Sequence, residues 1–363
     1  MAGGLLGENG MPVRPPLTIS AIVQSHKRRE FLPMALESLL CQAPRMPEEV
    51  ILLTPVDRPD VSQAYAERFR SRGVAFHTLT VGWTTVGDAL ARGILRATGE
   101  VIAPLDDDDR WEPAKIQRVS RSFAEDSELT LLHNGATLVD ASDLPIGRCN
   151  PHRYARHRST LLPEGIEAAF HPGGGSSLRR LLALEPMFNN SSLSIRREAV
   201  MPWIPQLEQV EGGEDGFLFY CALAAGGTVR ATTDRLTRIT IHGRATTATP
   251  VGLGTYNDRL VQYREFVRRN VCRLALCRDL VNASQSGVGA ALLTKEVEHW
   301  GVLQRVAGGA GPDASTSIIS REMMRTDLTP AGGTDILVRV MAVASAIAPR
   351  LTCAVWMTWR MAW

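Results

Sequence analysis

Four consecutive aspartates, Asp106 to Asp109, follow an apolar segment of strand length. Adjacent negative charges repel one another, so the run predicts a bound cation. Mg²⁺ and Mn²⁺ bind one or two carboxylates and complete their coordination with water and phosphate oxygens. Side chains alternate along a strand, so Asp106 and Asp108 would share one face, with Asp107 and Asp109 on the other. An acidic cap on the next helix is the alternative, but one aspartate suffices for a cap.

The chain around the aspartates alternates strand-like and helix-like segments. Apolar runs of strand length occupy 18–23, 49–54, 74–79 and 100–105. Between them, 28–42 and 85–98 carry apolar residues at steps of three and four, the helical period. This order is typical of a parallel sheet with helices on its faces, in which ligands bind at the carboxyl ends of the strands. The aspartate run lies at one such end.

Beyond residue 128 the pattern is less regular. Four further short strands are predicted at 129–133, 136–140, 228–233 and 236–243. Segment 212–227 begins and ends with glycines and is predicted as a helix. Segment 149–177 is rich in Pro, Gly, Arg and His, and a long irregular segment of this kind is more often functional than accidental.

Length and composition favour one main domain with an appendage. The chain has 363 residues, 44% of them hydrophobic, and single cores stop growing near about 250 to 300 residues. A net charge of +2 gives no general basic field for nucleic acid. The six cysteines lack zinc-site spacing and the first residues lack a signal peptide, which together predict reduced thiols and a cytoplasmic protein.

Two C-terminal segments are unusual in composition. Segment 259–278 carries six arginines and one acidic residue, which favours a solvated helix face. The last thirty residues, 334–363, are apolar, but their longest charge-free run is ten residues, short of the roughly 20 that span a bilayer. They predict a helix packed on the main domain or on a second subunit, with peripheral contact with a lipid interface as the alternative.

Several motifs occur in an order that is more specific than any one of them. They are SAIVQSHKRREFLPMALESLLCQ (20–42), GEVIAPLDDDDRWEPAKI (99–116), NNSSLSIRREAV (189–200), EDGFLFYCALAAGG (214–227) and ITIHGRATTAT (239–249). Together they resemble the family 2 glycosyltransferases, which are inverting enzymes. The resemblance covers about 17–265 and implies an α/β fold of the GT-A type, a Rossmann-like αβα sandwich with a mostly parallel central sheet. A flexible N-terminus (1–16) and a mainly helical C-terminal extension (266–363) would flank it.

The resemblance implies a role for each matching position. Asp106 and Asp107 would contact the ribose or sugar of a nucleotide-sugar, and Asp108 and His242 would contact Mn²⁺ or Mg²⁺ under its diphosphate. Asp215, beside Glu214, would be the base that takes a proton from the acceptor hydroxyl. Without the resemblance, the acidic pair would be explained as charge at a helix N-terminus and His242 as a structural histidine.

The chain departs from the family pattern on the donor side. Where the family has DDGSxD after its second strand, this chain has TPVDRPD (54–60), so the carboxylates available to read a nucleobase are Asp57 and Asp60. Ala91 replaces a usual asparagine, and Asp88 or Arg92 would compensate.

The first and fourth strands also differ from the family. Ser25, His26 and Arg28 stand where it has its donor loop. Pro104 removes a backbone donor from the strand before the aspartates, which predicts an edge strand or a local bend.

These features predict a metal-dependent inverting glycosyltransferase that transfers a sugar from a nucleoside-diphosphate sugar to a hydroxyl of a glycan, lipid-linked or polysaccharide acceptor. A sugar nucleotidyltransferase and a catalytically silent nucleotide- or glycan-binding relative are the alternatives. The former needs a glycine-rich loop after the first strand, which QSHKRREF (24–31) lacks. Basic residues within 149–180 suggest an anionic acceptor; these are His152, Arg153, Arg156, His157, Arg158, His171, Arg179 and Arg180.

Overall fold

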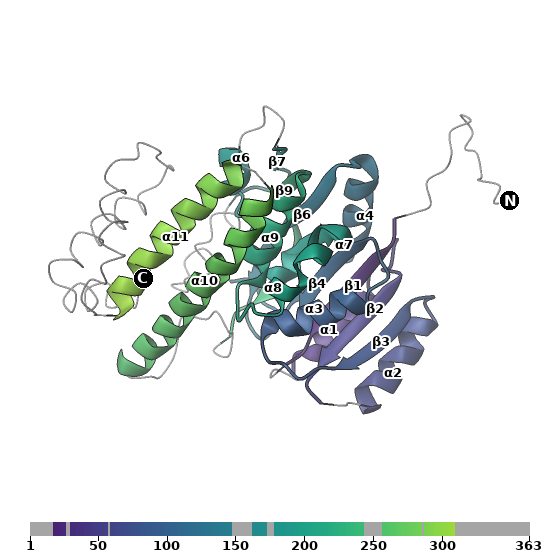
Figure 1. The fold of residues 1–363 in the computed structure, drawn as a ribbon. Coiled ribbons are helices and arrows are strands. Elements are labelled where there is room, and N and C mark those ends of the chain that lie inside the picture. Colours follow the sequence, from purple (N-terminus) through teal and green to yellow (C-terminus); the bar gives the residue numbers. More distant parts are fainter. Residues whose placement is uncertain are drawn as a thin grey trace, which may run out of the picture.

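The computed structural model describes residues 17–26, 30–56, 59–146, 162–172, 178–242, 256–284 and 287–308. Within these ranges, nine strands form one mixed sheet in the order β3-β2-β1-β4-β8-β6-β9-β5, with β7 paired to β9 (Figure 1). The strands are β1 (Ile19–Gln24), β2 (Glu49–Thr54), β3 (Ala75–Thr80), β4 (Val101–Asp106), β5 (Arg110–Trp111), β6 (Leu129–Val139), β7 (Glu167–Phe170), β8 (Leu193–Arg196) and β9 (Thr228–Thr240). β1 to β4 are parallel, whereas β8 runs antiparallel to both β4 and β6.

The helices lie between the strands and after the sheet. They are α1 (Leu32–Leu40), α2 (Pro59–Arg70), α3 (Val86–Arg96), α4 (Lys115–Glu125), α6 (Leu178–Leu182), α7 (Arg197–Val200), α8 (Ile204–Leu207), α9 (Glu214–Ala225), α10 (Tyr256–Ser284) and α11 (Gly287–Gly308). Two 3-10 turns, η2 (Asn190–Ser192) and η3 (Met201–Trp203), flank β8 and α7. None of the helices in the described part of the chain combines the length and apolar character of a membrane span.

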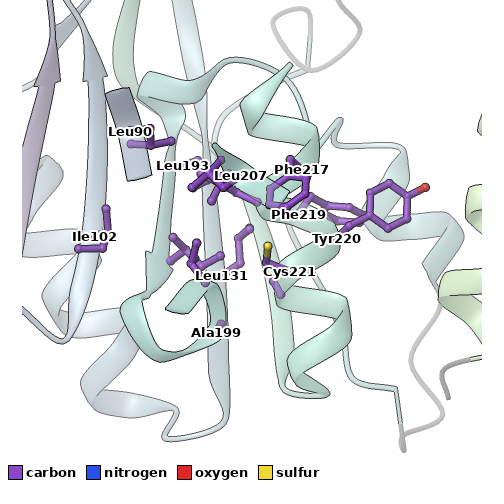
Figure 2. Packing of buried hydrophobic residues seen from close by; sticks show 14 of the residues in the cluster. Leu90, Ile102, Leu131, Leu193, Ala199, Leu207, Phe217, Phe219, Tyr220 and Cys221 are labelled. Carbon is purple, nitrogen blue, oxygen red and sulfur yellow. The ribbon is translucent and has the colours of Figure 1, made fainter. Parts of the chain in front are cut away.

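The sheet separates two buried apolar clusters, because side chains alternate along each strand. In β1, Ile19 and Val23 belong to one cluster and Ile22 to the other. Apolar residues of α1, α2 and α4 complete the first cluster, and those of α3, α9, α10 and α11 complete the second. Figure 2 shows Phe217 and Phe219 of α9 grouped with the second cluster. The strands β1, β2 and β4 are thus buried on both faces.

The sequence predicted the α/β class and the first four strands, and both predictions are confirmed. The segments predicted as four short strands after residue 128 do lie mostly in strands, but their division is wrong, because 129–139 and 228–240 are two long strands, β6 and β9. Their pairing shifts register around Gly135, where an added Cβ would lie 2.6 Å from the Thr233 carbonyl oxygen. Such irregularities break the period-2 pattern, so each long strand looks like two short ones.

Pro104 does not mark an edge strand, since β4 lies between β1 and β8, and this corrects one of the two alternatives. The local bend stays a prediction. β8 pairs with β4 only at Val101 and Ile102. Pro104, which has no backbone N–H to donate, therefore lies beyond the part of β4 that pairs with β8.

The C-terminal extension packs on the sheet domain. α10 and α11 run side by side, and α10 lies along α9 (Figure 1). Leu274 and Leu280 of α10 and Leu293 of α11 belong to the same buried cluster as α9. The expected boundary between residues 265 and 266 lies inside α10. The expected segments 1–16 and 334–363 lie outside the described residues.

Candidate functional site

The carboxyl ends of the central parallel strands bring the predicted site residues to one edge of the sheet. β1 and β4 are paired in register, with Gln24 opposite Asp106. Ser25, directly after β1, is buried, and its backbone N–H donates to the Leu53 carbonyl oxygen at 2.9 Å. The edge formed by β1, β2 and β4 is where ligands bind in sheets of this kind.

The aspartate run forms a tight turn at this edge. β4 ends at Asp106, and the Asp109 N–H donates back to the Asp106 carbonyl oxygen at 3.1 Å. Carboxylate oxygens of Asp106, Asp108 and Asp109 lie within 4.8 Å of one another. The predicted alternation of the four side chains is therefore wrong for Asp109, because the strand ends before it. Asp107 is fully buried, and its N–H donates to the Gln24 carbonyl oxygen at 3.1 Å.

His242 reaches the aspartate turn from the end of β9. Its Nε2 lies 2.8 Å from an Asp108 carboxylate oxygen, and both side chains are largely buried. The imidazole stacks on the Phe31 ring with a centroid separation of 4.8 Å. The structure thus brings together the two residues predicted to contact the metal.

Asp109 was not among the predicted site residues, although it belongs to the quoted run. Its carboxylate accepts hydrogen bonds from Asn189 Nδ2 at 2.9 Å and from the Thr240 N–H at 3.1 Å. Burial raises the pKa of Asp109, and the nearby Asp108 and Asp106 carboxylates raise it further. A bound cation would offset the repulsion within this cluster.

The second acidic pair lies in the first turn of α9. Gly213 precedes it with a φ of 76°, in the left-handed region that favours glycine. The Asp215 carboxylate accepts hydrogen bonds from the backbone N–H groups of Asn189 at 3.0 Å and of Gly216 at 2.7 Å. Burial raises the pKa of Asp215, and the Arg273 guanidinium opposes the rise. Burial also raises the pKa of Glu214 to about 8, and the Asp106 and Asp215 charges contribute to the rise.

Asn189 connects the aspartate turn to the acidic pair. Its side-chain amide donates to Asp109, and its backbone N–H donates to Asp215. Its φ is 71°, a left-handed conformation that asparagine tolerates better than most residues. Asn189 is the first residue of the motif NNSSLSIRREAV, from which no role was predicted for it. The signal available there was an asparagine pair before a short strand.

Ser191 and Lys115 belong to a buried hydrogen-bond network next to the aspartate turn. The Asp106 N–H donates to Ser191 Oγ at 3.0 Å, and the Ser191 carbonyl oxygen accepts from Trp111 Nε1 at 2.8 Å and from Lys115 Nζ at 3.1 Å. Lys115 is fully buried and also donates to Asn134 Oδ1. Burial lowers the pKa of Lys115 to about 7. This network fixes the backbone that carries Asp106.

The predicted donor-side residues are only partly described. The His26 ring lies 4.6 Å from the Trp83 ring, measured between centroids, and Trp83 has a φ of 46° in the loop after β3. The Asp88 carboxylate accepts from Thr84 Oγ1 at 2.8 Å and from Arg92 Nε at 3.0 Å. Its two oxygens thus take part in contacts near the start of α3. Arg28 and Asp57 lie outside the described residues, as do 147–161 and 173–177 of the basic insertion.

The fold is of the GT-A type. It has a mixed sheet with a parallel half, an acidic turn at the end of its fourth strand and an acidic pair at the start of a later helix. Residues 20–167 match the family model described as Glycosyl transferase family 2. Over this segment the chain is similar to the family 2 glycosyltransferases, as its motifs predicted.

Individual relatives agree with this assignment. An uncharacterized glycosyltransferase of Nostoc sp. (strain PCC 7120) is 28% identical over 233 residues, which span 62% of this chain and 66% of that protein, just under two thirds of its length. The crystal structure of S. aureus TarS 1-349 has a TM-score of 0.51 at 13% identity and covers 94% of this chain and 92% of that one. The same protein in complex with UDP-GlcNAc has a TM-score of 0.44 at 13% identity, covering 81% and 80%. At this identity the likeness to TarS 1-349 shows the fold alone.

Proposed function

We propose that this chain is a metal-dependent inverting glycosyltransferase that uses a nucleoside-diphosphate sugar. The observation that carries the proposal is the link from the aspartate turn to the acidic pair: Asn189 binds Asp109 through its amide and Asp215 through its backbone. One residue thus fixes a candidate metal site relative to a candidate base. Transfer with inversion needs this separation, because the leaving diphosphate and the acceptor lie on opposite faces of the sugar carbon.

The donor set of the aspartate turn suits Mg²⁺ or Mn²⁺. Both ions prefer oxygen ligands, and three carboxylates offer them within 4.8 Å. Asp106 is partly exposed, whereas Asp108 and Asp109 are buried, so the cluster is open on one side. A bound ion there would stabilise the charge that develops on the leaving diphosphate. Asp108 and Asp106 are the proposed ligands, and His242 orients Asp108 through their hydrogen bond.

The proposed base is Asp215. As the acceptor oxygen bonds to the anomeric carbon, the bond from that carbon to the diphosphate oxygen breaks and its electron pair leaves with the nucleoside diphosphate. The acceptor proton passes to the Asp215 carboxylate. Two backbone hydrogen bonds hold this carboxylate in one orientation. Glu214 is within electrostatic reach of Asp106, so we assign it to the donor side of the same site.

The test is hydrolysis and transfer with a panel of nucleotide-sugars in Mn²⁺. UDP-GlcNAc is the first member, because S. aureus TarS 1-349 is described in complex with it. We expect Asp108→Asn and Asp215→Asn each to lower turnover by about 10²- to 10⁴-fold, the usual contribution of such groups. Asp279→Asn on the exposed side of α10 is the control and should match the wild type. A wild type that binds a nucleotide-sugar but turns over none of the panel would support a catalytically silent relative instead.

The acceptor is a separate part of the proposal. We propose a hydroxyl on an anionic glycan or lipid-linked acceptor, supported by the exposed Arg179 and Arg180 of α6. A role in polysaccharide biosynthesis and peripheral membrane contact through 334–363 belong to the same proposal. Mass spectrometry of products from an acceptor panel, with matched neutral and anionic members, tests it. Preference for neutral acceptors would contradict it.

A further inference from the structure

A buried arginine of the C-terminal extension lies against the first turn of α9. Arg273, on α10, is 5% exposed. Its guanidinium is 3.4 Å from a Glu296 carboxylate oxygen of α11, and its Nη1 donates to the Gly213 carbonyl oxygen at 3.4 Å. Its Nε has no hydrogen-bond partner within the described residues. Long contacts to one carboxylate leave much of this buried charge to be stabilised by other groups.

The acidic pair of α9 is among these groups. Arg273 and Asp215 interact electrostatically, each favouring the charged form of the other, and Arg273 acts on Glu214 in the same sense. Glu296 also interacts electrostatically with both Arg273 and Asp215. The extension therefore places one positive charge that interacts both with the proposed base and with Glu296 of its own helix α11.

Two glycines of the α9 turn make room for this guanidinium. A Cβ added at Gly216 would lie 1.5 Å from Arg273 Nη1, and one added at Gly213 would lie 3.2 Å from Arg273 Cδ. The guanidinium thus occupies the space that a side chain at residue 216 would need. Packing this close fixes the position of the Arg273 guanidinium relative to the first turn of α9.

Other residues of α10 hold the same turn. Arg268 forms an ion pair with Glu211, two residues before Gly213, and also with Glu265 on its own helix. A Cβ at Gly212 would lie 3.5 Å from Arg269 Cδ. Segment 259–278 was predicted to be a solvated helix face. It is more than that, because the Arg273 side chain is buried against the first turn of α9.

We propose that Arg273 is a positioning residue of the transferase, which orients the first turn of α9 and stabilises the Asp215 carboxylate as the proton acceptor. The inference rests on the proposed function, in which Asp215 is the base. It extends the active site to a helix beyond the 20–167 segment that matches the family model.

The activity test compares Arg273→Met, Arg273→Lys and the exposed Arg278→Met of the same helix, in the full chain with Mn²⁺ and the nucleotide-sugar that the wild type uses. We expect Arg273→Met to lower kcat about 10- to 100-fold with donor KM changed less than about threefold, as for a misplaced catalytic group. Arg273→Lys should restore part of kcat, and Arg278→Met should match the wild type. A kcat of Arg273→Met within about twofold of the wild type, or a loss carried by donor KM alone, would overturn the inference.

A second test needs no substrate. Urea unfolding of wild type, Arg273→Met, Asp215→Asn and the double variant forms a double-mutant cycle. We expect Arg273→Met to lower the urea midpoint less when Asp215 is already Asn, because the variant then no longer leaves the Asp215 carboxylate uncompensated. Equal losses in both backgrounds would contradict the inference. Should Arg273→Met fail to fold, Arg273→Lys and Glu296→Gln take its place in the cycle. An inactive wild type would count against the proposed function alone, since the cycle still decides whether Arg273 acts on Asp215.

Discussion

His133 provides a prediction whose size follows from the structure. The residue lies on β6 and is 2% exposed, and its Nε2 is 2.6 Å from the Phe188 carbonyl oxygen, next to Asn189. Its Nδ1 is buried without a hydrogen-bond partner in the described ranges. A second proton on the ring would therefore have no acceptor. Burial lowers the pKa of His133 from 6.5 to about 4.

The depressed pKa couples folding to pH. Between pH 6.5 and about 4 the unfolded chain binds a proton at this residue and the folded chain does not, so stability falls as the pH falls through this window. Each pKa unit corresponds to about 1.4 kcal/mol, so the full effect is about 3 kcal/mol. Above pH 6.5 the contribution is fully present, and below about pH 4 it is lost.

The assay is urea unfolding of wild type and His133→Gln at several pH values from 7.5 to 4. The glutamine amide can still donate to Phe188, and the other titrating groups cancel in the difference between the two proteins. We expect the stability of the wild type relative to the variant to fall by about 3 kcal/mol across the window. A difference that is constant with pH would refute the reasoning, because it would mean that the folded protein accepts the proton on His133 as readily as the unfolded chain.

Substitutions at three further positions test the residues that support the site. Asn189→Ala should lose about 2 to 3 kcal/mol of stability in urea unfolding and most of its turnover. Asn189→Gly should lose about 1 to 2 kcal/mol less stability than Asn189→Ala, because glycine tolerates the φ of 71°. Equal losses of stability would contradict the argument from the backbone conformation. Gly216→Ala should displace Arg273 and cost about 1 to 3 kcal/mol in the same assay, and an unperturbed variant would show that the turn has spare room. Lys115→Met should cost about 1 to 3 kcal/mol at pH 7 by leaving Asn134 Oδ1 without its donor. Burial lowers the pKa of Lys115 to about 7, so the free energy of unfolding of the wild type should rise relative to Lys115→Met as the pH rises from 7 toward 10. A difference in stability that does not change with pH would contradict this.

The sequence predicted the parallel half of the fold because its strands are short, buried and regularly spaced. The aspartate run and the acidic pair were also found, since each stands at the end or start of a regular element. These local features survive folding because the sheet brings the carboxyl ends of β1 and β4 to one edge.

The parts that escaped prediction depend on contacts between distant residues. Gly135 and Thr233 are far apart in the chain, and only their close approach reveals the irregular pairing of β6 and β9. Asn189 gains its role from a backbone conformation and two partners that no local pattern encodes. The arginines of α10 look alike in the sequence, and only packing distinguishes the buried Arg273 from the exposed Arg278.

The central claim is that the aspartate turn holds a divalent cation together with a nucleoside diphosphate. Electron paramagnetic resonance of free Mn²⁺, titrated with protein and UDP, measures this most directly. The account predicts one tightly held ion per chain in the presence of UDP, lost in Asp108→Asn and unchanged in Asp279→Asn. Mn²⁺ that stays free in the wild type, or that binds equally well to Asp108→Asn, would contradict it.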